Sequence, residues 1–324
     1  MSDFYVAGVD LGGTKIYTVL AASNGEVLAE IKIPTEAEKG PQHVITRILE
    51  SVALVKREAP LASRRLRALA LGAPGPLDTS RGIIHFAPNL NWQDLPIREI
   101  LEGKTGIRVL LDNDANLAAL GEHVYGAGRG AENMVYITVS TGVGGGFILG
   151  GRLYRGSSDG AGEVGHMTVL PGGPLCSCGN CGCLEALASG TAIAREARQR
   201  VAGGGGREIL AAAGGDFGRI SAVSVAAAAA GGDPVAVSII EEAARFLGIG
   251  VANLVNLLNP SLVVLGGGVM KTGELIWEGV RREVGARALE TARARVRLAP
   301  AELGGRAGAI GAVALALQAV GPLE

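Results

Sequence analysis

An apolar strand, a glycine turn and a second apolar strand follow one another twice in this chain. Near the N-terminus, residues 6–10 and 16–20 flank the turn Leu11-Gly-Gly-Thr-Lys15, and near the middle, residues 134–140 and 147–149 flank residues 141–146. Short apolar runs bounded by glycine are typical of buried strands joined by tight turns. Because the pattern opens each half of the chain, it indicates an internal duplication.

Length and composition agree with a folded protein of two domains. The chain has 324 residues, which is long for one hydrophobic core, and its 48% apolar and 19% charged residues are typical of a globular protein. Helical periodicity or flanking signals predict helices at residues 41–59, 115–125, 234–258, 274–289 and 306–320.

Charge and hydropathy bear on partners and location. The net charge of −1 provides no overall attraction toward nucleic acid or membrane, so neither is expected as a partner. No run of eighteen apolar residues occurs, and the N-terminus has no basic segment followed by an apolar one. A cytoplasmic location is therefore expected.

Three glycine turns leave the ends of apolar strands, at residues 10–15, 140–146 and 265–268. Glycine permits positive φ there and lets backbone N–H groups approach phosphate oxygens. Asp10 precedes the first turn and can hold Mg²⁺ through water, while Thr14 and Thr141 add hydroxyl groups. One such turn is typical of a plain hairpin, but three, with an Asp at the first, favour phosphate binding.

Two other nucleotide motifs are excluded. Gly103-Lys104-Thr105 suggests a P-loop, but Arg98 stands where that motif requires its first glycine, and the segment follows a helix-like stretch rather than a strand. No Gly-x-Gly-x-x-Gly follows a strand either, so the sequence does not predict a dinucleotide site of the Rossmann type.

A metal site is predicted where all four cysteines gather. His166, Cys176, Cys178 and Cys183 are spaced as His-x₉-Cys-x-Cys-x₄-Cys, and one imidazole with three thiolates makes a closed, structural zinc site. Such crowding suits a metal site in a reducing compartment better than a disulfide framework. Cys181 forms a Cys-x-x-Cys pair with Cys178, so it could compete as a ligand, remain free or exchange disulfides with Cys178.

These motifs resemble those of the ROK family (repressor, open reading frame, kinase). Asp10-Leu-Gly-Gly-Thr-Lys15, Ser140-Thr-Gly-Val-Gly-Gly-Gly146 and Leu265-Gly-Gly-Gly268 are similar to the two phosphate motifs and the adenosine motif of the actin-like ATPase, or ribonuclease H-like, fold, and residues 176–185 closely resemble the ROK signature. The resemblance implies a duplicated α/β fold with ATP in a cleft between two domains. The domains would be residues 1–112 with about 305–324, and residues 113–304, which carry the zinc loop (166–183).

The resemblance also implies roles for single residues in an ATP-dependent sugar kinase. The positions that match the family's nucleotide and Mg²⁺ contacts are Asp10, Gly12, Gly13, Thr14, Lys15, Thr141, Gly142, Gly144, Gly266, Gly267 and Gly268. The triplet Asp112-Asn113-Asp114 lies between a predicted strand and a predicted helix, where the side chain of Asn113 or Asp114 can cap the helix. Asp114 also matches the family's catalytic base, which takes the proton of the sugar's 6-hydroxyl. The matching sugar contacts are Asn89, Asn113, Asp114, Glu163, His166 and Glu185.

Glucose is the expected sugar, because residues 112–122 and Gly172-Gly-Pro-Leu-Cys176 look most like bacterial glucokinases. Kinases for N-acetylglucosamine, N-acetylmannosamine, mannose and fructose share the motifs and stay open as alternatives, as does a donor such as polyphosphate. A homodimer or homotetramer is implied by the family alone.

The rival from another class is a sugar-sensing transcriptional regulator, since the ROK family includes repressors. These carry a helix-turn-helix domain ahead of the first phosphate motif, whereas nine residues precede Asp10 here, too few for three helices. A pure sensor would also not require Asp114 as a base. The regulator is therefore disfavoured.

Overall fold

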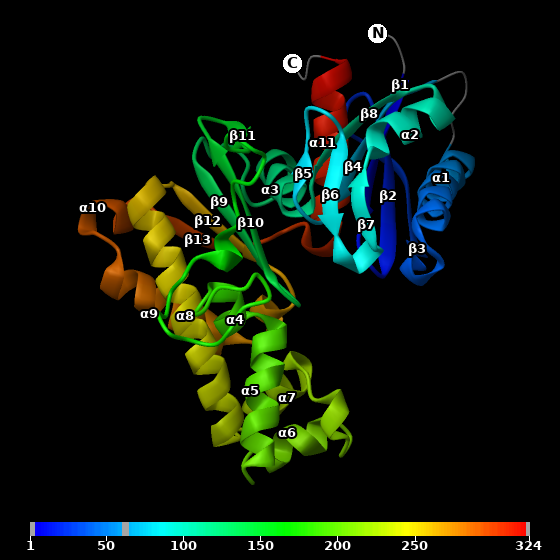
Figure 1. Cartoon of the computed structure of the whole chain (residues 1–324). Coiled ribbons are helices and arrows are strands. Elements are labelled where there is room, and N and C mark those ends of the chain that lie inside the picture. The colour runs from blue at the N-terminus through cyan, green and yellow to red at the C-terminus, as the bar shows by residue number, and fades with distance from the viewer. Residues whose placement is uncertain (1–3, 60–64, 322–324) are drawn as a thin grey trace. The chain divides into compact units, whose positions relative to one another are not determined.

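The computed structural model describes residues 4–59 and 65–321, whose elements are labelled in Figure 1. The described residues form two compact units and contain two five-stranded sheets and one three-stranded sheet. The first unit contains residues 1–130, 146–162 and 302–324, and the second contains residues 131–145 and 163–301.

The first unit is built on a five-stranded mixed sheet with the strand order β3-β2-β1-β4-β8. Strands β1 (Phe4–Leu11), β2 (Lys15–Ala22) and β3 (Val27–Pro34) form an antiparallel meander, and β4 (Arg65–Ala73) and β8 (Arg108–Asn113) run parallel to β1. Asp10 of β1 lies opposite Gly72 of β4, which lies opposite Asp112 of β8. The first glycine turn and the 112–114 triplet therefore lie at the carboxyl ends of β1 and β8, at one edge of this sheet.

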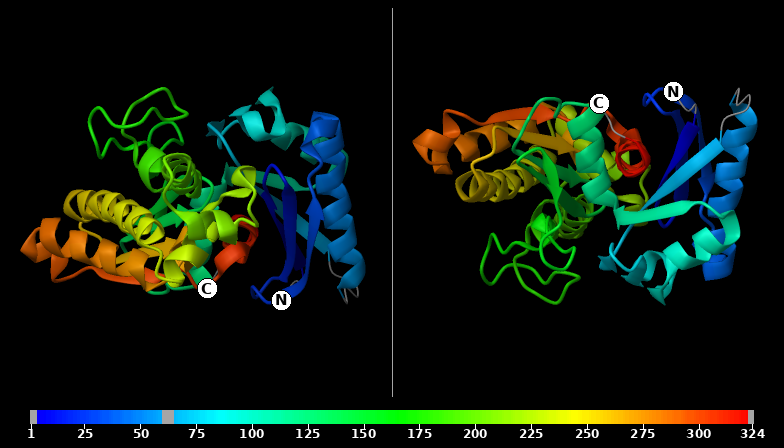
Figure 2. Two further views of the ribbon diagram at one scale, coloured as in Figure 1. Left: turned by 90° about the horizontal axis from the view of Figure 1, so that it is seen from below. Right: turned by 90° about the horizontal axis from the view of Figure 1, so that it is seen from above.

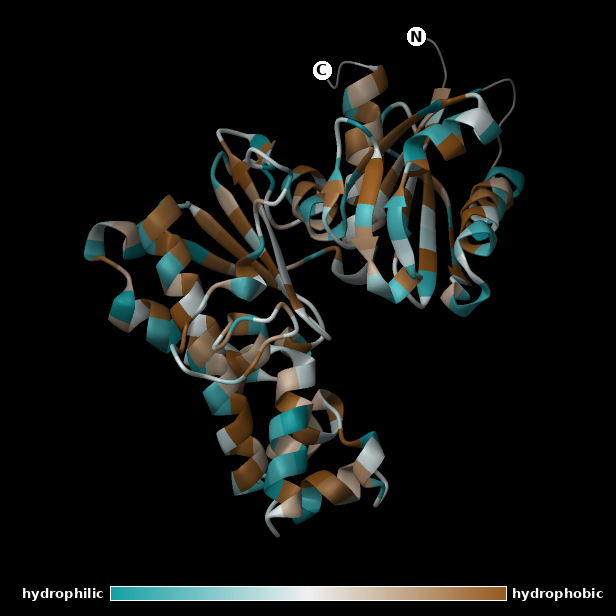
Figure 3. Ribbon diagram, viewed as in Figure 1, coloured by the Kyte–Doolittle hydropathy of each residue, from teal (hydrophilic) through white to brown (hydrophobic). Residues whose placement is uncertain are grey.

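Helices cover both faces of the first sheet. Val9 and Leu11 pack with α1 (Pro41–Glu58), whereas Val6 packs on the opposite face with α3 (Asp114–Tyr125) and α11 (Ala307–Val320), as the alternation of side chains along a strand requires. Figure 2 shows α1 and α11 on opposite sides of these strands, and Figure 3 shows the apolar character of α11. A β-carbon at Gly8 would lie 2.3 Å from the carbonyl oxygen of Ala309, so glycine lets α11 approach β1 closely.

A small antiparallel sheet and a helix complete the core of the first unit. The sheet has the order β5-β6-β7, and the helix α2 follows it directly. Its strands have two to five residues, which is too short for a clear periodic signal in the sequence. The elements are β5 (Leu77–Asp78), β6 (Ile83–Ala87), β7 (Trp92–Leu95) and α2 (Ile97–Thr105), with the 3₁₀ helices η1 (Ala37–Lys39), η2 (Pro88–Leu90) and η6 (Gly304–Arg306) elsewhere in this unit.

The second sheet repeats the topology of the first. Its order is β11-β10-β9-β12-β13, so a run of consecutive strands at one side is again followed by two strands parallel to the first of the run. This shared order supports the predicted duplication. The boundary between the units passes through β10, so residues 146–162 belong to the first unit. The strands are β9 (Met134–Val139), β10 (Val143–Leu149), β11 (Arg152–Tyr154), β12 (Leu262–Gly266) and β13 (Arg297–Pro300).

The longest helix of the second unit is α8 (Pro234–Leu258), which packs against α9 (Glu274–Arg287). Its start and stop follow the sequence, because the Asp233 side chain accepts the Ala236 N–H at 2.7 Å, Pro234 occupies the first turn, and Asn259 ends the helix in the left-handed region. The remaining helices are α4 (Leu184–Ala188), α5 (Gly190–Ala202), α6 (Arg207–Ala212), α7 (Ala222–Ala230) and α10 (Glu290–Arg293), with η3 (Val164–His166), η4 (Phe217–Arg219) and η5 (Val269–Lys271).

No helix of the described residues is by itself long and apolar enough to span a membrane. Helices α7 and α8 reach the required length and composition only when taken together, and they meet at a bend of 119°.

The extents of the two units differ from the boundaries expected from the sequence. Residues 113–130 and 146–162 belong to the first unit and not to the second. Residues 113–130 do so because α3 packs tightly on α11: a β-carbon at Gly311 would lie 1.7 Å from the carbonyl oxygen of Leu117. The return to the first unit begins at Glu302, three residues before the expected position. The ends of the expected ranges, 1–3 and 322–324, lie outside the described residues.

Candidate active site

The first glycine turn joins β1 to β2, and two hydrogen bonds from Thr35 support it. The Thr35 hydroxyl donates to the Gly12 carbonyl at 2.7 Å, and its N–H donates to the Thr14 carbonyl at 3.0 Å. With these carbonyls engaged, the turn keeps one shape, while Thr14 and Lys15 stay exposed. The predicted phosphate contacts of the first unit thus stand on a supported loop.

Asp10 lies beside this turn and close to the N-terminus of α11. A β-carbon at Gly308, the second residue of that helix, would lie 2.8–3.1 Å from the atoms of the Asp10 carboxyl group. Burial raises the pKa of Asp10, and the positive charge of Lys15 opposes that rise. A bound cation would favour the charged carboxylate further, so the position fits the predicted Mg²⁺ contact.

Asn89 comes to the same turn from η2. A β-carbon at Gly13 would lie 3.0 Å from the β-carbon and 3.2 Å from the carbonyl oxygen of Asn89. The structure thus brings together a predicted phosphate contact and a predicted sugar contact that are 76 residues apart in the chain.

Asn113 and Asp114 form the junction of β8 and α3. The Asn113 side chain caps the helix, because its Oδ1 accepts the N–H groups of Ala115 at 2.9 Å and Asn116 at 3.2 Å. Asp114 is the first residue of α3 and remains partly exposed, with its Oδ1 accepting the Ala115 N–H at 2.8 Å. A carboxylate at a helix N-terminus is stabilised in the charged form that a general base requires.

In the second unit, the turn of residues 140–142 is tied to the start of α5. The Gly190 N–H donates to the Ser140 carbonyl at 2.7 Å, and the Thr191 hydroxyl donates to the Thr141 carbonyl at 2.8 Å. Ser140 also accepts the Gly268 N–H at 3.2 Å through its hydroxyl, which joins the second glycine turn to the third.

The third turn requires glycine for steric reasons. Gly267 has φ +93°, and a β-carbon there would lie 2.2 Å from the carbonyl oxygen of Val139. Gly266 ends β12 and is buried, whereas Gly268 faces a pocket. Of the three predicted adenosine contacts, Gly268 therefore lies at accessible space, and the other two shape the turn.

That pocket has a volume of about 450 Å³ and lies wholly within the second unit. Its wall is mostly apolar, with the hydroxyl-bearing residues Ser140, Thr141, Thr191, Ser221 and Thr272. This composition is typical of sites for small organic ligands. The pocket residues of α5, of α7 and of the short segment before α7 could not be predicted from the sequence, because ordinary helix residues carry no motif that marks them. These residues are Gly190, Thr191, Ala194, Arg198, Ile220, Ser221, Ala222 and Val223.

The predicted metal ligands do come together. The ligand atoms of His166, Cys176, Cys178 and Cys183 all lie within 4.8 Å of one another. His166 Nδ1 is 3.6 Å from Cys176 Sγ, and the sulfur atoms of Cys178 and Cys183 are 3.7 Å apart. Tetrahedral zinc bonds of about 2.0–2.3 Å separate such ligand atoms by about 3.6–3.8 Å, so the four residues fit a zinc ion. Cys181 does not belong to this group.

Glu163 and Glu185 lie beside the cysteine cluster. Glu163 Oε2 is 3.9 Å from His166 Nε2, the ring nitrogen opposite the one that meets Cys176. Glu185 accepts the Val143 N–H at 3.0 Å and the Ser177 hydroxyl at 3.3 Å. A β-carbon at Gly142 would lie 2.4 Å from Glu185 Oε2, so the second glycine turn and the predicted sugar carboxylate meet directly.

The predicted site residues therefore form two groups, one in each unit. The group of the first unit is Asp10, Gly12, Gly13, Thr14, Lys15, Asn89, Asn113 and Asp114. The group of the second unit is Thr141, Gly142, Gly144, Glu163, His166, Cys176, Cys178, Cys183, Glu185, Gly266, Gly267 and Gly268.

Comparison with known proteins identifies the family. The sequence profile of the ROK family matches residues 6–319 of this chain. A glucokinase of Halalkalibacterium halodurans is 40% identical over 312 residues, which cover 96% of this chain and 94% of the relative. A xylose repressor of Caldicellulosiruptor bescii is 34% identical, over 96% of this chain and 78% of the repressor.

Solved structures give the same result. A ROK hexokinase from Thermus thermophilus is 42% identical, with a TM-score of 0.84 over 98% of this chain and 99% of that one. A ROK family glucokinase from Streptomyces griseus, in complex with glucose and AMPPNP, is 37% identical, with a TM-score of 0.83 over 97% of this chain and 99% of that one. Both the predicted family and the predicted α/β, actin-like ATPase fold are confirmed, and the chain belongs to the ROK family.

Proposed function

We propose that this protein is an ATP-dependent kinase that phosphorylates the 6-hydroxyl group of glucose. The carrying observation is the edge of the first sheet, where Asp10 with its glycine turn and Asn113 with Asp114 lie at the carboxyl ends of parallel strands. Phosphoryl transfer needs bound phosphate, a cation and a base for the hydroxyl proton, and this edge supplies a candidate for each.

Each candidate has a part in the reaction. Asp114 accepts the proton of the 6-hydroxyl as that oxygen attacks the γ-phosphorus of ATP, and ADP leaves from the opposite side of the phosphorus. Asp10 would hold Mg²⁺, usually through water, and the ion would supply positive charge next to the phosphates. The backbone N–H groups of the glycine turns bind phosphate oxygens, and the pocket next to Ser140 and Gly268 takes the adenosine.

The hexose would be held by side chains that donate or accept hydroxyl hydrogen bonds. The candidates are Asn89, Asn113, Glu163, His166 and Glu185. Zinc at His166, Cys176, Cys178 and Cys183 would be structural, because a closed set of four ligands leaves no open position. It would fix His166 through Nδ1 and leave Nε2 on the side of Glu163.

We infer glucose, rather than another hexose, as the substrate, because relatives named glucokinase match nearly the whole chain at 38–40% identity. Relatives named as xylose repressors also match the chain, so a sugar-sensing transcriptional regulator is the second candidate function. The feature that favours the kinase is Asp114, partly exposed at the start of α3. We expect the enzyme to act in the cytoplasm, where ATP is abundant, as a homodimer or homotetramer.

The test is the release of ADP from Mg-ATP by purified, zinc-replete protein. Glucose, mannose, fructose, N-acetylglucosamine and N-acetylmannosamine are compared as substrates, with polyphosphate as a second donor. The highest kcat/KM is expected with glucose and ATP. A higher value with another hexose would retain the kinase and replace its substrate, and binding of a sugar without turnover with either donor would favour the regulator.

A further inference from the structure

Asp112 is a buried carboxylate directly before the pair Asn113 and Asp114. It is the last buried residue of β8, with 0% of its surface exposed. Its Oδ1 accepts the Asn113 N–H at 2.8 Å and the Asn116 side-chain amide at 3.1 Å. No role for Asp112 is implied by the sequence motifs, although it is two residues before the predicted base.

Arg155, one residue beyond β11, supplies the counter-charge. Its Nε and Nη2 donate to Asp112 Oδ2 at 2.8 Å and 2.6 Å. Burial raises the pKa of Asp112, and the Arg155 guanidinium is the strongest influence that opposes this rise. A buried carboxylate that loses its partner is strongly destabilised in the charged form, so Asp112 depends on Arg155 to remain an anion.

The same carboxylate sets the geometry of the β8–α3 junction. As an anion, Asp112 is a stronger acceptor for the Asn113 N–H than a neutral carboxyl group would be. Asn113 in turn caps α3, and Asp114 is the first residue of that helix. Hydrogen bonds and an ion pair thus connect Arg155 to the backbone on which Asp114 stands, although they are 41 residues apart in the chain.

We propose that Arg155 is a positioning residue for the catalytic base: it binds Asp112 and thereby holds the β8–α3 junction in the geometry that proton transfer to Asp114 requires. This inference rests on the proposed kinase function. Arg155 itself touches neither the sugar nor ATP in this proposal, and it acts through Asp112. A small displacement of a reacting group lowers kcat more than it lowers ground-state binding.

The first experiment compares Arg155→Gln with Arg152→Gln, a matched control at an exposed arginine of β11. We expect kcat of Arg155→Gln to fall by about 10–100-fold, while KM for glucose and for ATP changes by less than about threefold. Arg152→Gln should keep kcat within about twofold of the wild type. A kcat for folded Arg155→Gln within that same range overturns the inference, and a wild type without turnover overturns the kinase function first.

Further variants separate positioning from general stability. Arg155→Lys keeps the charge but lacks the planar guanidinium, so we expect a kcat between those of the wild type and Arg155→Gln. Millimolar guanidinium ion should raise kcat of Arg155→Ala and leave the wild type unchanged. In a double-mutant cycle, Asp112→Asn should cost much less activity in the Arg155→Gln background than alone. Failure of guanidinium to raise kcat, or full additivity in the cycle, would contradict the proposal.

Discussion

At the scale of single residues, the candidate site depends on carboxylates whose surroundings differ. Asp10 lies against the N-terminal turn of α11, Asp112 is buried beside Arg155, and Asp114 is partly exposed at the start of α3. Asp114 is partly exposed and is the first residue of a helix, so a bound hydroxyl group can reach its carboxylate, as a base requires.

The first prediction concerns Asp114. We expect Asp114→Asn to lower kcat for glucose by about 10²–10⁴-fold, because an amide cannot accept the proton, while KM for ATP stays near that of the wild type. Steady-state kinetics with ADP detection measure both constants. The control is Asp94→Asn, an exposed carboxylate of β7 in the left-handed region, which Asn tolerates. A near-normal kcat for Asp114→Asn would remove this residue as the base.

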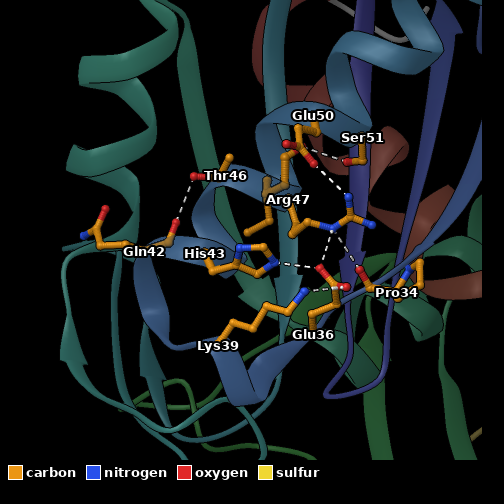
Figure 4. Close-up of polar contacts among 10 residues, drawn as sticks. Pro34, Glu36, Lys39, Gln42, His43, Thr46, Arg47, Glu50 and Ser51 are labelled. Carbon is orange, nitrogen blue, oxygen red and sulfur yellow. Dashed lines mark hydrogen bonds and ion pairs between the residues drawn. The ribbon is translucent and has the colours of Figure 1, made fainter.

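At the scale of elements, short connections are held by charged groups. Figure 4 shows Glu36, between β3 and η1, surrounded by basic side chains of η1 and α1. It meets Lys39 at 2.9 Å and His43 at 2.7 Å, and Arg47 lies 3.7 Å away. Glu36 has φ 55°, an uncommon conformation for this residue, and follows Thr35, which supports the first glycine turn.

The second prediction is the pH dependence of this connection. Hydrogen bonds from Lys39 and His43 lower the pKa of Glu36 from 4.5 to about 2. A carboxyl group with a depressed folded-state pKa stabilises the protein above its unfolded pKa and loses that effect as the pH falls toward the folded value. The melting temperature of Glu36→Gln should therefore lie below that of the wild type at pH 6–7, and the two should converge between about pH 4.5 and pH 2.

Glu38→Gln serves as the control for this comparison, because Glu38 is an exposed neighbour in the same 3₁₀ helix. Its melting temperature should follow that of the wild type throughout the range. A difference between Glu36→Gln and the wild type that does not change with pH would contradict the assigned pKa shift.

The third prediction concerns the loop of residues 166–183. We expect purified protein to contain about one zinc ion per chain, measured by atomic emission, and Cys183→Ser to lose that zinc and melt at a lower temperature. Cys181→Ser should retain both the zinc and the melting temperature, because Cys181 lies outside the cluster of ligand atoms. Loss of zinc from Cys181→Ser, with retention in Cys183→Ser, would reverse the assignment of these two cysteines.

At the scale of the whole molecule, one buried carboxylate joins the segment before the chain first leaves the first unit to the segment where it finally returns, at residue 302. Glu122 of α3 is fully buried, and its oxygens accept the N–H groups of Ala127, Glu302 and Leu303 at 3.0, 3.1 and 2.7 Å. The last two residues are 180 or more positions away in the chain. Glu122 therefore fastens the returning segment, and with it α11, to α3.

The fourth prediction follows from these hydrogen bonds. Glu122→Ala leaves three backbone donors without their carboxylate, so the free energy of unfolding should fall by about 1–3 kcal/mol. Chemical denaturation measures the change, with Glu132→Ala, an exposed glutamate, as the control that should differ little from the wild type. Equal stability of the two variants would show that other groups replace Glu122.

The sequence by itself determined the family, the α/β duplication and the local signals of the site. The signals of the site are local patterns: glycine turns after apolar strands, the capping triplet at residues 112–114 and the His-Cys spacing. Each can be predicted from the sequence, because it depends on local backbone geometry or on ligand chemistry. The start and end of α8 were equally clear, because Asp233, Pro234 and Asn259 act within a few residues of themselves.

Only the tertiary structure decided which distant residues meet. Three such contacts join segments that are tens to hundreds of residues apart. They are the pocket wall on α5 and α7, the Arg155–Asp112 ion pair and the hydrogen bonds of Glu122 with the N–H groups of residues 302–303. The placement of α3 in the first unit was also decided there, by its packing on α11. Such contacts arise when whole elements bury their apolar faces against each other, and a linear pattern does not record which ionic partner that packing brings to a buried carboxylate.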